Sequence, residues 1–135
     1  MARILVIDDD EMVSATIAQM LTGAGYEVAL SNGGEDGCRQ CHSTQFDLVI
    51  CDVFMPGKDG IETVRELRAS ALKVPIICVT GGGSHRDVTG ADADDVLGML
   101  RLFGATQTLT KPFQSSELLA TVEACLLAAD AGEEN

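Results

Sequence analysis

Five side chains that could take part in a chemical reaction stand where short apolar segments of the sequence end. They are Asp8, Asp9, Asp52, Thr80 and Lys111. A buried carboxylate without a partner is costly, so we interpret Asp52, which ends the apolar run 48–51, as a reactive group. A carboxylate can act as a nucleophile that accepts a phosphoryl group. Further carboxylates near it would favour a hard divalent cation with oxygen ligands, and an ammonium group would stabilise negative charge.

Each of these side chains is predicted to follow a β-strand. Apolar runs predict strands at residues 3–7, 26–30, 48–51, 75–79 and 107–110. Helical spacing of apolar residues predicts helices after Asp10, over 35–44, 61–69 and 91–103, and from Ser115 onward. Strands that alternate with helices predict an α/β, doubly wound, five-stranded parallel sheet with helices on both faces. Because ligands bind outside the carboxyl ends of such strands, we expect the five side chains on one rim.

Length and charge limit the classes of function. The 135 residues fit one domain, which we expect at residues 1–130, with an acidic, disordered tail at 131–135. The net charge of −12 argues against binding to nucleic acid and to anionic membrane surfaces. The apolar run at residues 4–7 is too short for a signal peptide, and no run approaches the roughly 18 residues of a membrane helix. We therefore expect a cytoplasmic protein with five reduced cysteines.

The sequence resembles the receiver domain of two-component response regulators of the chemotaxis-regulator type over almost its whole length. The matching motifs are residues 4–9, Asp52 with Met55-Pro56, Asp59-Gly60, Val79-Thr80-Gly81, Gly104-Ala105 and Lys111-Pro112-Phe113. The resemblance implies a flavodoxin-like sheet with the strand order 2-1-3-4-5. It also implies that Asp52 accepts a phosphoryl group from a sensor histidine kinase or a phosphotransfer protein, with small acyl phosphates as alternative donors.

The resemblance implies further roles at the rim. Asp9 and Asp52 would bind Mg²⁺ directly, Asp8 would help through water, and the backbone carbonyl of Phe54 would be another ligand. Thr80 and Lys111 would hold the phosphoryl oxygens. The expected protein is a stand-alone signalling module, a monomer or weak homodimer, which acts on an unknown downstream protein by contact and is not an enzyme with an external substrate.

Other interpretations remain open for the same residues. Asp8 and Asp9 could cap the first helix together with Asp10, Thr80 could form a turn, and Lys111 could be solvated. At the level of function, one alternative is a receiver-like interaction module that works without phosphorylation. Another is a small phosphatase similar to the haloacid dehalogenase group, whose Asp-x-Asp pattern Asp8 and Asp10 match only in spacing.

Four features depart from the family pattern or suggest another one. Thr108 occupies the position three before the lysine, where receivers usually carry an aromatic switch residue. The segment 80–104 is long, and we hypothesise that a loop at 81–95 remodels on phosphorylation in place of the aromatic ring. The ring of Phe54 is expected to hinder hydrolysis of the phosphate. Residues 38–42 match the c-type haem attachment pattern, but their place in a predicted helix, with Cys38 and Cys41 facing inward, favours packing.

Overall fold

Strands of this protein form one parallel sheet. The computed structural model describes residues 1–81 and 93–133. The strands are β1 (Arg3–Ile7), β2 (Glu27–Ser31), β3 (Leu48–Asp52), β4 (Ile76–Gly81) and β5 (Gln107–Lys111). Their order in the sheet is β2-β1-β3-β4-β5, and every neighbouring pair is parallel. The predicted doubly wound α/β fold and its strand order are confirmed.

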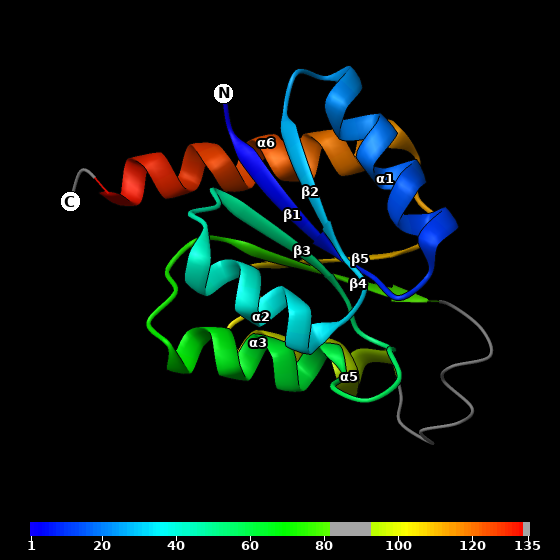
Figure 1. Ribbon diagram of the computed structural model, residues 1–135, viewed down its shortest axis with the longest axis vertical. Coiled ribbons are helices and arrows are strands. Elements are labelled where there is room, and N and C mark those ends of the chain that lie inside the picture. The colour runs from blue at the N-terminus through cyan, green and yellow to red at the C-terminus, as the bar shows by residue number, and fades with distance from the viewer. Residues whose placement is uncertain (82–92, 134–135) are drawn as a thin grey trace.

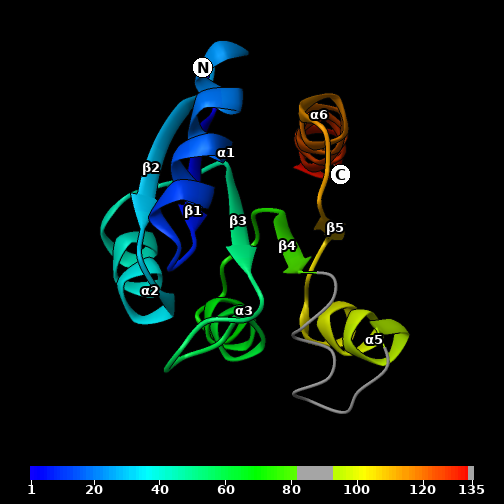
Figure 2. The same ribbon diagram turned by 90° about the vertical axis from the view of Figure 1, so that its right-hand side faces the viewer.

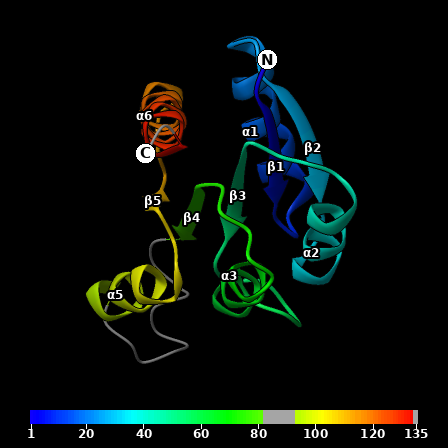
Figure 3. The ribbon, with the colours of Figure 1, turned by 90° about the vertical axis from the view of Figure 1, so that its left-hand side faces the viewer.

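Helices cover both faces of the sheet. They are α1 (Glu11–Gly23), α2 (Gly34–Ser43), α3 (Gly60–Ala69), α5 (Ala93–Phe103) and α6 (Ser115–Glu133). Figure 1 shows α1 and α6 on one side of the strands and α2 and α3 on the other. The two side views, Figures 2 and 3, show α5 beside α3 and away from α6. The helices and the sheet make three layers. Because all five strands are parallel, their carboxyl ends share one edge of the sheet.

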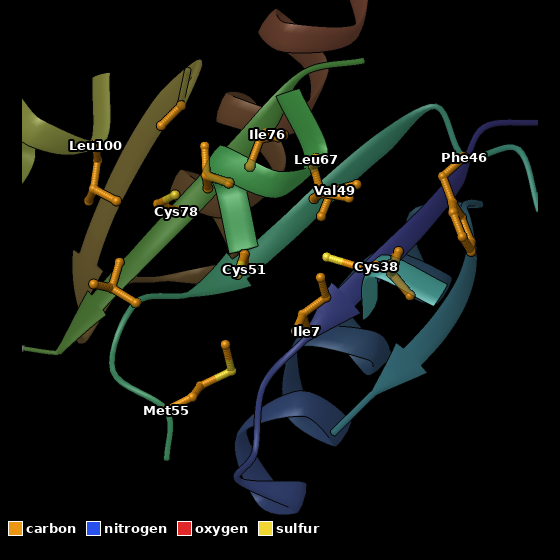
Figure 4. Close-up of a cluster of buried hydrophobic side chains, with 14 residues drawn as sticks. Ile7, Cys38, Phe46, Val49, Cys51, Met55, Leu67, Ile76, Cys78 and Leu100 are labelled. Atoms are coloured by element: carbon orange, nitrogen blue, oxygen red, sulfur yellow. The ribbon is translucent and has the colours of Figure 1, made fainter. Parts of the chain in front are cut away.

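Two apolar layers hold the sheet between the helices. Alternation along β1 directs Leu5 and Ile7 into the layer under α2, α3 and α5, and Ile4 and Val6 into the layer under α1 and α6. Figure 4 shows part of the first layer, with side chains from β1, β3 and β4 meeting. All five residues of β3 are buried, as an interior strand covered on both faces requires. Asp52 is thus held at the end of the most enclosed strand.

Several element bounds differ from the predicted ones. Strand β4 extends through Thr80 to Gly81, and β5 includes Lys111, because these residues pair with each other across the two strands. The hypothesised loop at 81–95 falls largely on residues 82–92, outside the described residues, while Gly81 ends β4 and residues 93–95 begin α5. Within the described ranges, no helix is both long and apolar enough to cross a membrane.

The tail was predicted too long. Helix α6 runs to Glu133, so residues 131–133 of the expected disordered segment 131–135 are helical, and the last two lie outside the described residues. The sequence Leu-Leu-Ala-Ala-Asp-Ala leads into this end of the helix, and alanine and leucine have high helix propensity. Local propensity therefore continues the helix past Asp130.

Candidate functional site

Carboxylates at the ends of two neighbouring strands meet one ammonium group at the carboxyl edge of the sheet. One carboxylate oxygen from each of Asp8, Asp9 and Asp52 lies within 4.8 Å of the others. Lys111 Nζ lies 3.6 Å from Asp8 Oδ2 and 3.8 Å from Asp52 Oδ1. Asp8 and Asp9 directly follow β1, Asp52 ends β3 and Lys111 ends β5, and β1 and β3 are neighbours in the sheet. The structure thus brings together four of the five side chains singled out in the sequence.

Backbone hydrogen bonds orient the first acidic segment. Asp8 Oδ1 accepts a hydrogen bond of 2.9 Å from the amide of Asp10, which leaves Oδ2 to face Lys111. Asp10 is the N-cap of α1, and its carboxylate accepts from the amides of Met12 and Val13. Because Asp10 caps the helix, Asp8 and Asp9 are not needed for that role.

The segment after Asp52 is fixed by a close approach of helix α3. The amide of Val53 donates to the carbonyl of Val79 at 3.0 Å, and the amide of Gly60 donates to the carbonyl of Val53 at 2.8 Å. A Cβ atom on Gly60 would lie 2.5 Å from the carbonyl oxygen of Asp52, so only glycine fits there without a shift. The start of α3 therefore holds the end of β3 in place.

Burial and repulsion set the ionisation of the carboxylates. Only 7% of Asp52 is exposed. Burial, followed by the nearby Asp8 carboxylate, raises the pKa of Asp52 to about 6, although Lys111 and the amide of Phe54 lower it. Burial also raises the pKa of Asp8. The positive charge of Lys111 does not offset the combined effect of burial and the neighbouring carboxylates on the pKa of Asp52.

The donor set fits a hard divalent cation such as Mg²⁺. Its atoms are carboxylate oxygens, the ligands that this ion prefers. Asp8 and Asp52 are buried and Asp9 is exposed, so the cluster opens to solvent on one side. Phe54 lies beside the cluster, because its amide hydrogen-bonds the Asp52 carboxylate. A cation here would offset the burial and the repulsion that together raise the pKa of Asp52.

Thr80 and the ring of Phe54 have contacts with elements other than the carboxylate cluster. Thr80 is buried, and its hydroxyl lies 3.5 Å from the carbonyl oxygen of Leu109 and 3.4 Å from Thr110 Oγ1. Phe54 is partly buried, and its side chain packs against the apolar layer under α2, α3 and α5. Both residues border the site, and both have contacts away from it.

Two positioning residues were not singled out as such in the sequence. In the sequence Gly60 stood out only as part of the motif Asp59-Gly60, because its close approach to Asp52 is a tertiary contact. Asp59 is the N-cap of α3 and accepts from the amide of Glu62 at 2.9 Å. The pattern Asp59-x-x-Glu62 is a helix-start signal that would have found it.

The haem-like cysteine pattern is part of the packing. Cys38 is buried in the layer of Figure 4, and burial is the main cause that raises the pKa of its thiol to about 12. Cys41 is partly buried, and His42 Nδ1 lies 2.7 Å from the carbonyl oxygen of Cys38. All five cysteines are free thiols. The inward orientation predicted for Cys38 is confirmed.

Comparison with known proteins shows the family of this chain. The family model described as "Response regulator receiver domain" matches residues 4–123. Response regulator MprA of Mycolicibacterium vanbaalenii is 38% identical over 125 residues, which cover 92% of this chain and 50% of that protein. Transcriptional regulatory protein DltR of Streptococcus agalactiae is 32% identical over 121 residues, which cover 89% and 50%. The chain thus spans about half the length of these relatives.

Solved structures show the same likeness. Chemotaxis protein CheY4 of Vibrio cholerae is 28% identical with a TM-score of 0.80, and the match covers 93% of this chain and 98% of that one. A response regulator receiver domain protein from Clostridium thermocellum is 26% identical with a TM-score of 0.83, with coverage of 97% and 98%. From the family match and these relatives, we conclude that the chain belongs to the response regulator receiver domains of two-component systems.

Proposed function

We propose that Asp52 is the residue that accepts the phosphoryl group and that the reaction depends on Mg²⁺. The observation that carries this proposal is the meeting of three carboxylates and one ammonium group at the end of the buried strand β3. Phosphoryl transfer needs alignment and charge stabilisation more than covalent help from the protein. A rim with a carboxylate nucleophile, a cation site and a lysine has these parts.

The proposed transfer is a displacement at phosphorus. An oxygen of the Asp52 carboxylate forms the new O–P bond while the P–N bond to the phosphohistidine of the donor breaks. The nitrogen of the donor keeps the electron pair of the broken bond. In a small acyl phosphate the leaving group is instead a carboxylate oxygen. Asp52 must be ionised to attack, and Lys111, 3.8 Å from its Oδ1, favours the ionised form.

Other residues of the chain have supporting roles in this proposal. Asp8, Asp9, Asp52 and the carbonyl of Phe54 would hold Mg²⁺, which would supply positive charge to the phosphoryl oxygens. Lys111 would pair with one of these oxygens as a point charge. The hydroxyl of Thr80 would donate a hydrogen bond to another, for which it must leave its contacts on β5.

We further propose a sensor histidine kinase or a phosphotransfer protein as the donor, and signalling through changed protein contacts. The strong acidity of the chain suits basic partner surfaces better than nucleic acid. Five free thiols suit a reducing compartment, the cytoplasm. The stand-alone arrangement and the monomer or weak homodimer stay predictions.

Intact-mass measurement tests the phosphorylation site. The protein is incubated with acetyl phosphate and Mg²⁺, and we expect the mass of one phosphoryl group to be added. Asp52→Ala should not gain this mass. Asp59→Asn is a matched control, because it removes a carboxylate outside the cluster and asparagine still caps helix α3. A phosphoryl group that remains on Asp52→Ala, or one that needs no Mg²⁺, would contradict the proposal.

A further inference from the structure

The hydroxyl of Thr80 makes its contacts on strand β5. Its Oγ1 lies 3.4 Å from Thr110 Oγ1 and 3.5 Å from the carbonyl oxygen of Leu109. We propose that Thr110 is a positioning residue that retains the Thr80 hydroxyl on β5 until Asp52 carries a phosphoryl group. This inference rests on the proposed function and adds a residue to its regulation.

The register of the sheet places the two threonines side by side. Thr80 and Thr110 are directly opposed in the ladder between β4 and β5, so their side chains lie on the same face. Cys78, two residues before Thr80, belongs to the apolar layer of Figure 4, whereas Val79 and Leu109 belong to the opposite layer. The hydroxyl pair therefore lies on the face of the sheet that α3 and α5 cover.

The contacts of the Thr80 hydroxyl on β5 are long and weak, so a better acceptor can replace them. Both separations are longer than the usual O–H···O distance of about 2.7 Å, and only 7% of Thr80 is exposed to water. A hydroxyl has one hydrogen to donate. A charged phosphoryl oxygen accepts a shorter hydrogen bond that is roughly twice as strong. Phosphorylation would therefore draw the hydrogen of Thr80 away from Thr110.

Thr110 lies where a change at Thr80 can reach the surface of the protein. Thr110 is exposed, and it precedes Lys111, which contacts Asp8 and Asp52. Thr108, at the position of the usual aromatic switch, is opposed to Cys78, and among the described residues it has no hydrogen bond to Thr80. In this chain the change at Thr80 thus reaches the exposed edge of β5 through a hydroxyl pair and not through a ring.

Binding of beryllofluoride, a non-covalent mimic of the phosphoryl group, tests the role of Thr110. Affinity is measured by fluorine NMR titration of the full chain with Mg²⁺ present. Thr110→Val removes the competing hydroxyl and suits a strand, and it should bind beryllofluoride about threefold more tightly, the effect of one weak hydrogen bond. Thr110→Ser restores the hydroxyl and should behave like the wild type. Thr108→Val is the matched control and should leave the affinity unchanged.

A double-mutant cycle separates positioning from a general effect on the strand. In a Thr80→Val background, Thr110→Val should no longer change the affinity, because the hydroxyl that it retains is absent. The inference is overturned if Thr110→Val binds as the wild type does, if its gain persists in Thr80→Val, or if Thr108→Val shows the same gain. A wild type that binds no beryllofluoride would instead overturn the proposed function, and this inference with it.

Discussion

Replacing Asp52 by Asn tests the electrostatic description of the site without any phosphoryl donor. In the metal-free protein, burial and the Asp8 carboxylate raise the pKa of Asp52 from 3.8 to about 6. Each unit of pKa corresponds to 1.36 kcal/mol, so ionised Asp52 reduces the free energy of unfolding by about 3 kcal/mol at pH 8. Asp52→Asn keeps the shape of the side chain and removes this charge. The variant should be more stable than the wild type by about that amount.

The free energy of unfolding of the wild type changes with pH in a defined direction. Because the folded state binds the proton of Asp52 more tightly than the unfolded state, stability falls as pH rises from about 3.8 to about 6. Below this pH window the Asp52 carboxyl is protonated in both the folded and the unfolded state, so it does not change the free energy of unfolding. The advantage of Asp52→Asn should therefore be about 3 kcal/mol at pH 8 and about half of that at pH 5.

Urea unfolding followed by far-ultraviolet circular dichroism measures this difference. In the presence of EDTA, the urea midpoint of Asp52→Asn should be higher by about 1–2 M. Adding Mg²⁺ should narrow the gap, because a bound cation offsets the repulsion in the wild type. Asp47→Asn, an exposed carboxylate at the opposite end of the sheet, should change stability by less than about 0.5 kcal/mol. A variant no more stable than the wild type at pH 8, or a gap independent of pH, would refute the reasoning.

Three further substitutions test other contacts of the site. Lys111→Met should slow phosphorylation by acetyl phosphate about 10²-fold, because the ammonium group beside Asp52 is lost; an unchanged initial rate by intact mass would count against its role. Gly60→Ala should reduce the free energy of unfolding by about 1–3 kcal/mol through its clash with the Asp52 carbonyl, whereas Gly98→Ala, which meets no atom within 4 Å, should not destabilise in the same urea assay. Phe54→Asn should shorten the lifetime of the phosphate, followed as the decay of the phosphorylated mass, and an equal rate of decay would show that the ring does not exclude water.

Much of the fold could be predicted from local patterns. The apolar run 48–51 indicated a strand covered on both faces, and β3 is buried along its whole length. Asp10 was predicted as a helix cap and is the N-cap of α1. These features depend on residues close in the sequence, where strand alternation, helical spacing and capping act directly. The end of α6 was predicted less well, because acidic composition suggested disorder where alanine propensity continues the helix.

The sequence by itself determined which groups stand at the carboxyl ends of the strands, since that depends only on where each apolar run stops. Only the tertiary structure decided their distances and partners. The pairing of Lys111 with Asp8 and Asp52, the repulsion between Asp8 and Asp52, and the contact of Thr80 with β5 all arise between residues at least 29 positions apart. Such contacts follow from strand order, register and the approach of α3 to β3, which no local pattern encodes, because electrostatic and steric effects depend on separations in space.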